Sequence, residues 1–195
     1  MDEIASKLRK LSREQLLVFG YLCCTYLFDS YRAFSLKYDQ GDIKLLKRAI
    51  AVIRDRIVLK SPVPNLNKTL SLVEKEIPHT EDYPSVLSSF ALDASNAIFE
   101  TLSFLKNDDV QRIIDISIFC RDTVDMYIQE RDDMDYDDPR FEDRIAKDKL
   151  MIAELDRQRK LIDKIRSTDE FDSDAISQLQ AINQITNRPD LSIFL

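Results

Sequence analysis

A run of thirteen uncharged residues, LLVFGYLCCTYLF at positions 16–28, places the strongest constraint on how this chain can fold. A membrane-spanning helix needs about twenty apolar residues, so this run is too short to cross a bilayer. A helix that is apolar on all sides has to be covered by protein. The run therefore predicts a helix that other elements bury on most sides.

Capping and turn signals set the limits of this helix. Ser12 and Gln15 have the spacing of a capping box, which predicts a start at Ser12 and a helix that continues to about Tyr38. Gly41 suits the left-handed conformation that follows a helix, and Asp42 suits the N-cap of the next one.

The rest of the chain shows apolar residues at helical spacing and no alternation of period two, which indicates an all-α protein. The residues 42–60 illustrate the pattern, because their apolar side chains share one helix face. That face consists of Ile43, Leu46, Ala49, Ile50, Ile53 and Ile57. Further helices are expected at about 67–76, 84–105, 108–129, 138–165 and 174–186.

These helices predict a single all-α domain over residues 1–195, a helical bundle of six or seven helices with orthogonal or mixed packing. Its core should lie at about residues 5–170, and residues 171–195 should form a C-terminal helix and a docking tail. The helix at about 108–129 should be central, because apolar residues extend around most of its surface.

The helix after residue 138 should begin with Asp138 as its N-cap and Pro139 at its first position. Its apolar side is expected to consist of Phe141, Ile145, Ile152, Leu155, Ile162 and Ile165. Gln158 and Arg159 interrupt that side. Self-association through this helix is one hypothesis for the assembly of the protein.

The charge balance limits the classes of partner. The chain has 35 acidic and 28 basic residues, a formal net charge of −7, which disfavours nucleic acid and anionic membranes and favours a partner with a basic surface. Three cysteines, two of them adjacent, imply no disulfide framework, and the first residues lack the features of a secretory signal. We therefore expect a cytoplasmic protein.

The most acidic stretch places eight carboxylates between Glu130 and Asp143. A calcium loop starting at Asp133 fails, because Asp138 stands where glycine is needed and Arg144 replaces the last carboxylate ligand. We interpret the stretch as a solvated turn that caps a helix. The residues expected to meet a basic partner are Asp132, Asp133, Asp135 and Asp137.

Metal, cofactor and nucleotide sites are not expected. Glu76 and His79 have the Glu-x-x-His spacing of a two-metal bundle, but Pro78 separates them and His79 is the single histidine of the chain. We interpret His79 as an exposed turn residue. Two glycines cannot form a phosphate-binding loop, and the basic residues of 42–60 lack the interleaved aromatic residues of a nucleic-acid site.

Asp93 is the most unusual single residue, because it lies at the edge of an apolar helix face. A half-buried carboxylate there needs a partner, most simply an arginine or a backbone N–H. The structural interpretation competes with a functional one, in which Asp93, Glu100 and Tyr127 line a ligand pocket between two helices.

Two motifs carry a resemblance to a known family. EKEIPHTEDYP at residues 74–84, followed by ALDASNAIFETL at residues 91–102, resembles the bacterial YjaG-like family, a domain of unknown function. The matching positions are Ile77, Pro78, Glu81, Asp82, Ala91, Asp93 and Ala94. The resemblance covers about residues 5–170 and implies a cytoplasmic all-helical domain. It implies no reaction.

Three functions remain open at this point. Because the chain lacks a catalytic constellation and its charges are segregated, a non-enzymatic protein-binding module is the leading hypothesis. One form of it is an immunity-type antagonist of a basic toxin. The alternative is a small-ligand-binding protein or enzyme that uses Asp93 in a pocket between helices.

Overall fold

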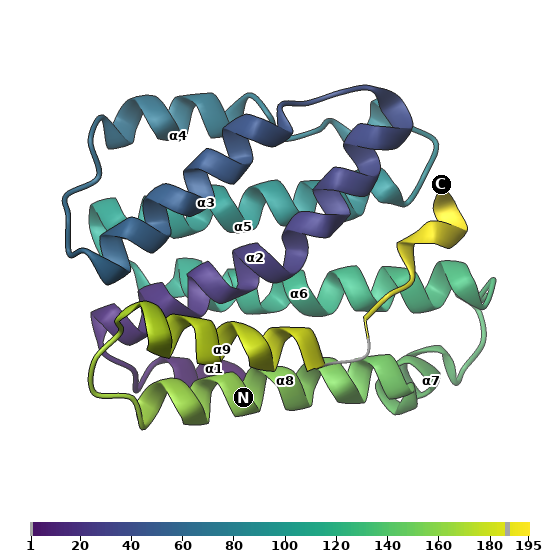
Figure 1. Cartoon of the computed structure of the whole chain (residues 1–195). Coiled ribbons are helices and arrows are strands. Elements are labelled where there is room, and N and C mark those ends of the chain that lie inside the picture. The colour runs from purple at the N-terminus through teal and green to yellow at the C-terminus, as the bar shows by residue number, and fades with distance from the viewer. Residues whose placement is uncertain (1, 186–187) are drawn as a thin grey trace.

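The computed structural model describes residues 2–185 and 188–195, and the described residues form helices without any strand (Figure 1). The all-α, single-domain class is thus confirmed. The α-helices are α1 (Glu3–Leu8), α2 (Arg13–Tyr38), α3 (Ile43–Val58), α4 (Leu66–Glu74), α5 (Leu87–Asn107), α6 (Val110–Arg131), α7 (Phe141–Lys147), α8 (Lys149–Arg166) and α9 (Ser173–Ile185). Two 3-10 turns are η1 (Thr80–Asp82) and η2 (Leu191–Phe194).

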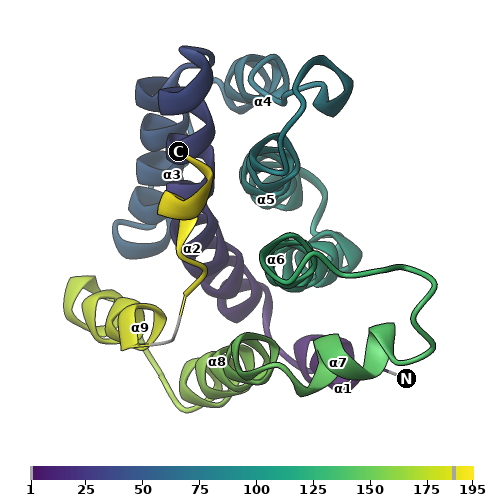
Figure 2. The same ribbon diagram turned by 90° about the vertical axis from the view of Figure 1, so that its right-hand side faces the viewer.

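Helix α2 carries the uncharged run and is buried along it, as the sequence predicts. Residues 16–24 are all buried. The helix contacts α3, α5, α6, α8 and α9, and its pairing with α5 is the most extensive in the described part of the fold. In Figure 2, α4, α5 and α6 are seen nearly end-on, while α2 and α3 run beside them.

The helix expected to be central, α6, packs against α5, α2, α8 and α1. Helices α2 and α5 share the centre of the domain with it. The reason is the length of the uncharged run in α2, which requires more cover than one face of a neighbour supplies.

The local capping signals are confirmed. The Ser12 hydroxyl accepts a hydrogen bond from the Gln15 backbone N–H at 3.3 Å, and the Gln15 side chain accepts one from the Ser12 backbone N–H at 2.9 Å. Asp42 caps α3 by accepting from the Leu45 N–H at 2.9 Å. Gly41 has a left-handed φ of 79°, and the apolar face of α3 is buried from Leu46 to Ile57.

The described helices number nine instead of six or seven, for two reasons. The sequence analysis did not identify α1, in which Asp2 accepts from the Ile4 N–H at 2.9 Å. It also joined α7 and α8, which are separated at Asp148. This residue has an extended ψ of 140°, and its carboxylate caps α8 through the Leu150 N–H at 2.7 Å. The predicted end of the last helix at Thr186 lies outside the described residues.

Helix α7 begins slightly later than predicted. Asp138 accepts a hydrogen bond from the Arg140 N–H at 2.9 Å, and the helix begins at Phe141. Asp138 therefore caps the turn that leads into α7, and Pro139 lies in that turn and not at the first helical position.

The buried face of α8 is partly different from the predicted one. Ile162 and Ile165 are buried, but Ile152 is 53% exposed. Glu154, Arg157 and Gln158 occupy the buried face in its middle. The buried charges of Glu154 and Arg157 neutralise each other, so a prediction from apolar residues alone misplaces the buried face in the first half of α8 but not at Ile162 and Ile165. The inner face packs against α6 and α9 within the same chain.

The C-terminal tail lies against the domain. The Phe194 ring packs edge-on against Phe90 at 5.9 Å and against Tyr127 at 5.7 Å between centroids. Lys37 donates a hydrogen bond to the Phe194 carbonyl oxygen. Phe194 thus packs against both α5 and α6, whereas Ile193 and Leu195 stay exposed.

Candidate functional site

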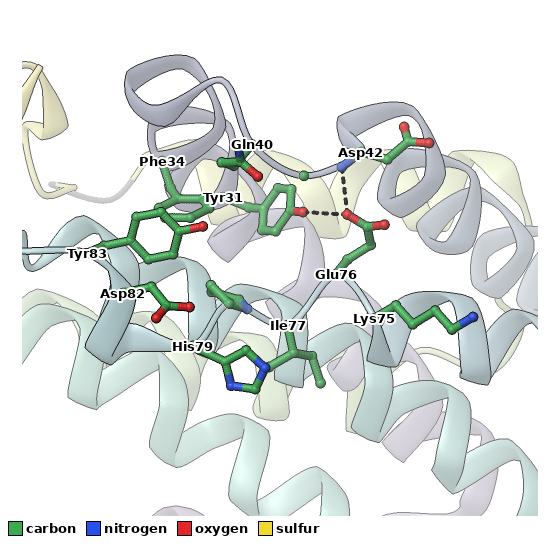
Figure 3. A pocket seen from close by; sticks show the side chains of 12 residues that line it. Tyr31, Phe34, Gln40, Asp42, Lys75, Glu76, Ile77, His79, Asp82 and Tyr83 are labelled. Carbon is green, nitrogen blue, oxygen red and sulfur yellow. Dashed lines mark hydrogen bonds between the residues drawn. The ribbon is translucent and has the colours of Figure 1, made fainter.

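A cavity of about 440 Å³ opens where the end of α2 and the turn into α3 face the segment that follows α4 (Figure 3). We call it the Glu76 pocket. Its lining residues are Tyr31, Phe34, Gln40, Gly41, Asp42, Lys75, Glu76, Ile77, Pro78, His79, Asp82 and Tyr83. Cavities of 300–1,000 Å³ are typical of small-ligand sites, so the volume suits a metabolite.

Glu76 joins three segments of the chain at this pocket. One of its carboxylate oxygens, Oε2, accepts hydrogen bonds from the Tyr31 hydroxyl at 3.1 Å and from the Asp42 backbone N–H at 2.7 Å. Tyr31 belongs to α2, and Asp42 is the N-cap of α3. The carboxylate therefore fixes the segment after α4 against the α2–α3 turn.

Gly41 is required at this turn for two reasons. Its φ of +79° is a conformation that side-chain-bearing residues rarely adopt. A Cβ at this position would also lie 2.1 Å from the Tyr31 hydroxyl oxygen. Only glycine therefore lets the hydroxyl pass beneath the turn and reach Glu76.

The Tyr31 hydroxyl acts as a permanent donor in this arrangement. Burial raises the pKa of Tyr31 well above its usual value, and the nearby Glu76 carboxylate raises it further. The phenol consequently stays protonated at neutral pH and donates to Glu76. This hydrogen bond holds the wall of the pocket and does not activate a nucleophile.

Three aromatic rings support one wall of the pocket. Tyr83 packs edge-on against Phe34, with 4.8 Å between ring centroids and an interplanar angle of 84°. Tyr38 lies 4.8 Å from Tyr83 and 5.2 Å from Phe34. These contacts hold Tyr83 against α2, although it belongs to the loop after η1.

The residues that the sequence proposed as a ligand site make three separate contacts. The Asp93 carboxylate accepts a hydrogen bond from the Thr123 hydroxyl at 2.8 Å. Glu100, two turns further along α5, pairs with Arg112. Tyr127 packs against Phe194 of the tail, as described above.

Among the described residues, no arginine or backbone N–H pairs with the Asp93 carboxylate as the sequence analysis expected, and the environment of Asp93 favours the protonated acid. The residue is 7% exposed. Burial raises the pKa of Asp93 to about 7, the neighbouring Asp122 adds to the increase, and the Thr123 hydrogen bond opposes it. Thr123 also lines a cavity of about 90 Å³, which is small for a metabolite.

The four proposed partner-binding carboxylates are not equivalent. Asp132 is engaged within the chain, because Arg131 donates to it at 2.7 and 2.9 Å and thereby lowers the pKa of Asp132. Asp135 accepts the Asp137 backbone N–H at 2.9 Å. Asp133, Asp135 and Asp137 are exposed, and within the described structure no cationic side chain pairs with them.

Comparison with known proteins identifies the family. A family model described as "Protein of unknown function (DUF416)" matches residues 3–188. The chain belongs to the DUF416 family. The resemblance inferred from the two sequence motifs is thereby confirmed.

Two curated DUF416 relatives, each called "Uncharacterized protein YjaG", come from Salmonella typhimurium and Salmonella typhi. Each is 25% identical to this chain over 126 residues, and the match covers 64% of this chain and 64% of the relative. The aligned part thus spans less than two thirds of the length of either relative.

A DUF416 crystal structure from Shewanella baltica OS155 has the same fold. Its TM-score is 0.84, with 22% sequence identity, and the match covers 94% of both chains. At this identity the likeness establishes the fold alone.

Reasoning from the sequence missed the DUF416 chain's most polar buried cluster. Arg157 donates to both oxygens of Glu154 at 2.6 and 2.7 Å and to the Asn183 side chain at 2.7 Å. Asn183 in turn donates to the Leu22 carbonyl at 2.7 Å. The Tyr26 ring lies 3.9 Å from the Arg157 guanidinium. The i,i+3 spacing of Glu154 and Arg157 was the available signal.

Sequence reasoning weighed Glu76 and His79 as metal ligands and His79 as an exposed turn residue, and it missed their common pocket. Tyr31 follows Asp29 and Ser30 and precedes Arg32, so its neighbours in the sequence carry no signal of a distant partner. His79 is exposed, as expected.

Two further observations concern the described residues of this DUF416 protein. Within 2–185 and 188–195, no three His, Cys, Asp or Glu side chains come close enough together to hold a metal ion. None of the helices in the same ranges has the length and apolarity that a membrane crossing requires.

Proposed function

We propose that this chain is a small-ligand-binding protein of the cytoplasm and that the Glu76 pocket is its site. The supporting observation is the cavity of about 440 Å³, into which polar groups from three segments converge. Ile77, Pro78 and Asp82, which carry the family resemblance, line this cavity. The three cysteines are free and buried, which agrees with a reducing compartment.

The construction of the pocket favours binding over catalysis. Glu76 is held in place by two hydrogen bonds to Oε2, and Tyr31 keeps its proton. The Tyr31 hydroxyl is then not available as a nucleophile at neutral pH. The remaining polar groups, among them Gln40, Asp82 and His79, can provide hydrogen bonds to a ligand.

The absence of tryptophan from the sequence permits a direct test. His79→Trp places a single fluorophore at the edge of the pocket, and Tyr136→Trp places one on the distant acidic loop, where Tyr136 is 77% exposed. A library of small polar metabolites should contain compounds that change the fluorescence of the first variant saturably and leave the second unchanged. If every compound affects both variants equally, or neither, the proposal is wrong.

A second candidate function is a protein-binding module with a basic partner, which includes an antagonist of a basic toxin. It is favoured by the exposed carboxylates of Asp133, Asp135 and Asp137, which have no cationic partner in the described structure. Because such a contact depends on charge, the complex should form at low salt and weaken as salt is added.

The test of this second function compares two triple variants of equal net charge. Replacing Asp133, Asp135 and Asp137 by asparagine should abolish retention of the partner from lysate. The matched control neutralises three exposed carboxylates elsewhere, namely Asp169, Glu170 and Asp174, and should retain the partner. Equal loss of partner retention in both variants would show that the contact is general charge attraction, and this second function would then be wrong.

A further inference from the structure

The unpaired charges of the Glu76 pocket are mainly negative. Glu76 uses only its Oε2 atom in the hydrogen bonds to Tyr31 and Asp42, which leaves Oε1 available. Asp82 is exposed, and no hydrogen bond or ion pair engages its carboxylate within the described structure. Both residues line the cavity, and within the described structure neither carboxylate is paired with a cation.

Lys75 is the cation among the lining residues, and it does not neutralise these carboxylates. No carboxylate of the described residues lies within 4 Å of its ammonium group. Figure 3 shows its side chain extending away from Asp82 and Tyr83. A positive charge inside the pocket would consequently meet unopposed negative charge.

The aromatic rings of the pocket provide a second attraction for a cation. The rings of Tyr31, Phe34 and Tyr83 line the cavity, and the contacts with Phe34 and Tyr38 hold Tyr83 in place. Aromatic ring faces attract organic cations, and they do so more strongly where water is partly excluded. An anion would meet the carboxylates of Glu76 and Asp82 here, and a neutral ligand would gain nothing from the unpaired charge.

We propose that the Glu76 pocket binds a small organic cation, an amine or a quaternary ammonium compound, between the carboxylates of Glu76 and Asp82 and the ring of Tyr83. This assignment rests on the proposed function and adds the chemical class of the ligand. The positive group lies near Oε1 of Glu76 and the Asp82 carboxylate, and its methylene or methyl groups contact the aromatic wall.

The native protein contains its own reporter for a test. His79 is the single histidine, so its Hε1 proton gives one resolvable NMR signal at the pocket. The protein is titrated with putrescine, choline, myo-inositol and succinate, which are two cations, a neutral polyol and an anion. At least one of the two cations should shift the His79 signal saturably, with an affinity that falls as salt is added.

Two variants of equal charge locate the binding. Asp82→Asn should weaken binding of the cation about two- to five-fold, the effect of one partly exposed charge pair. Asp133→Asn removes an equivalent charge from the acidic loop and should leave the affinity unchanged. Equal weakening by both variants would show general charge attraction and overturn the assignment.

The probes also separate failure of this inference from failure of the proposed function. A His79 shift with myo-inositol or succinate, and with neither cation, overturns the cation assignment and leaves a ligand-binding pocket. No shift with any of the four probes overturns the cation assignment. If the metabolite library also leaves the His79→Trp fluorescence unchanged, the proposed function fails as well.

Discussion

Glu76 and the buried cluster of Glu154, Arg157 and Asn183 each hold several segments of the chain together, but the charges of the two glutamates are balanced in different ways. Glu154 is buried and forms a two-pronged pair with Arg157 on the same helix. Glu76 is only partly buried, and its partners are a phenol and a backbone N–H, both neutral. In the Glu154 cluster the positive charge of Arg157 balances the negative charge of Glu154, whereas Glu76 retains negative charge at the surface of a cavity.

Asp93 is a third case that clarifies this comparison. It is buried like Glu154 but has one hydroxyl partner and no cation. Its charge is removed by a proton, because burial raises its pKa to about 7. The comparison indicates that a carboxylate satisfied by a cation or a proton is structural, and that a carboxylate left with negative charge at a cavity can serve a ligand.

The largest expected effect comes from removing the cation of the Glu154 cluster. Arg157→Met leaves Glu154 as an unpaired buried charge and should lower the free energy of unfolding by about 3–5 kcal/mol. Urea denaturation monitored by circular dichroism measures it. The double variant Glu154→Met with Arg157→Met removes both charges and should recover most of the loss. A single variant within about 1 kcal/mol of the natural protein would contradict a structural ion pair.

The pH dependence of stability tests the proton at Asp93. The unfolded carboxyl loses its proton near pH 4, whereas folded Asp93 keeps it until about pH 7. The folded state therefore binds more protons in this window, and the resulting stabilisation, complete below about pH 4, is lost as the pH rises to 7.

Asp93→Asn should therefore gain stability relative to the natural protein across this window, by up to about 4 kcal/mol between pH 4 and pH 7. Urea denaturation at several pH values measures the difference. Asp133→Asn, which removes an exposed carboxylate, is the control. If the two variants show the same pH dependence, Asp93 does not hold its proton in the folded state.

Gly41→Ala tests the geometry that brings Tyr31 to Glu76. The substitution forces a side chain into a left-handed conformation and against the Tyr31 hydroxyl, which should cost about 2–3 kcal/mol in unfolding free energy. Gln40→Ala, at the exposed neighbouring position, should have little effect in the same thermal and urea measurements. Equal stability of the two variants would show that the turn adapts without glycine.

The smallest expected effect is that of a single hydrogen bond from a neutral donor to Glu76. Tyr31→Phe removes this donor and leaves the Asp42 N–H in place, so the loss should be about 1.5 kcal/mol. Tyr136→Phe removes an exposed hydroxyl and is the matched control. A loss as large as that of Arg157→Met would mean that Glu76 resembles Glu154 and is mainly structural.

Local signals in the sequence predicted much of the fold. The Ser12 capping box, the Asp42 cap, the left-handed Gly41 and the apolar face of α3 all depend on residues close in the chain. The predicted helix boundaries were wrong where a single polar residue ends one helix and begins the next. Asp148 ends one helix and starts the next by capping it, a choice that the surrounding apolar pattern does not indicate.

The sequence by itself determined the helical class, most helix positions and the family, because these follow from short-range periodicity and motifs. Only the tertiary structure decided which polar residues are paired. Asn183 reaches the Leu22 carbonyl across 161 positions, and Glu76 reaches Tyr31 across 45. Whether a carboxylate is neutralised depends on its burial and its contacts in the folded chain, and this neutralisation separates the structural carboxylates from those available to a ligand.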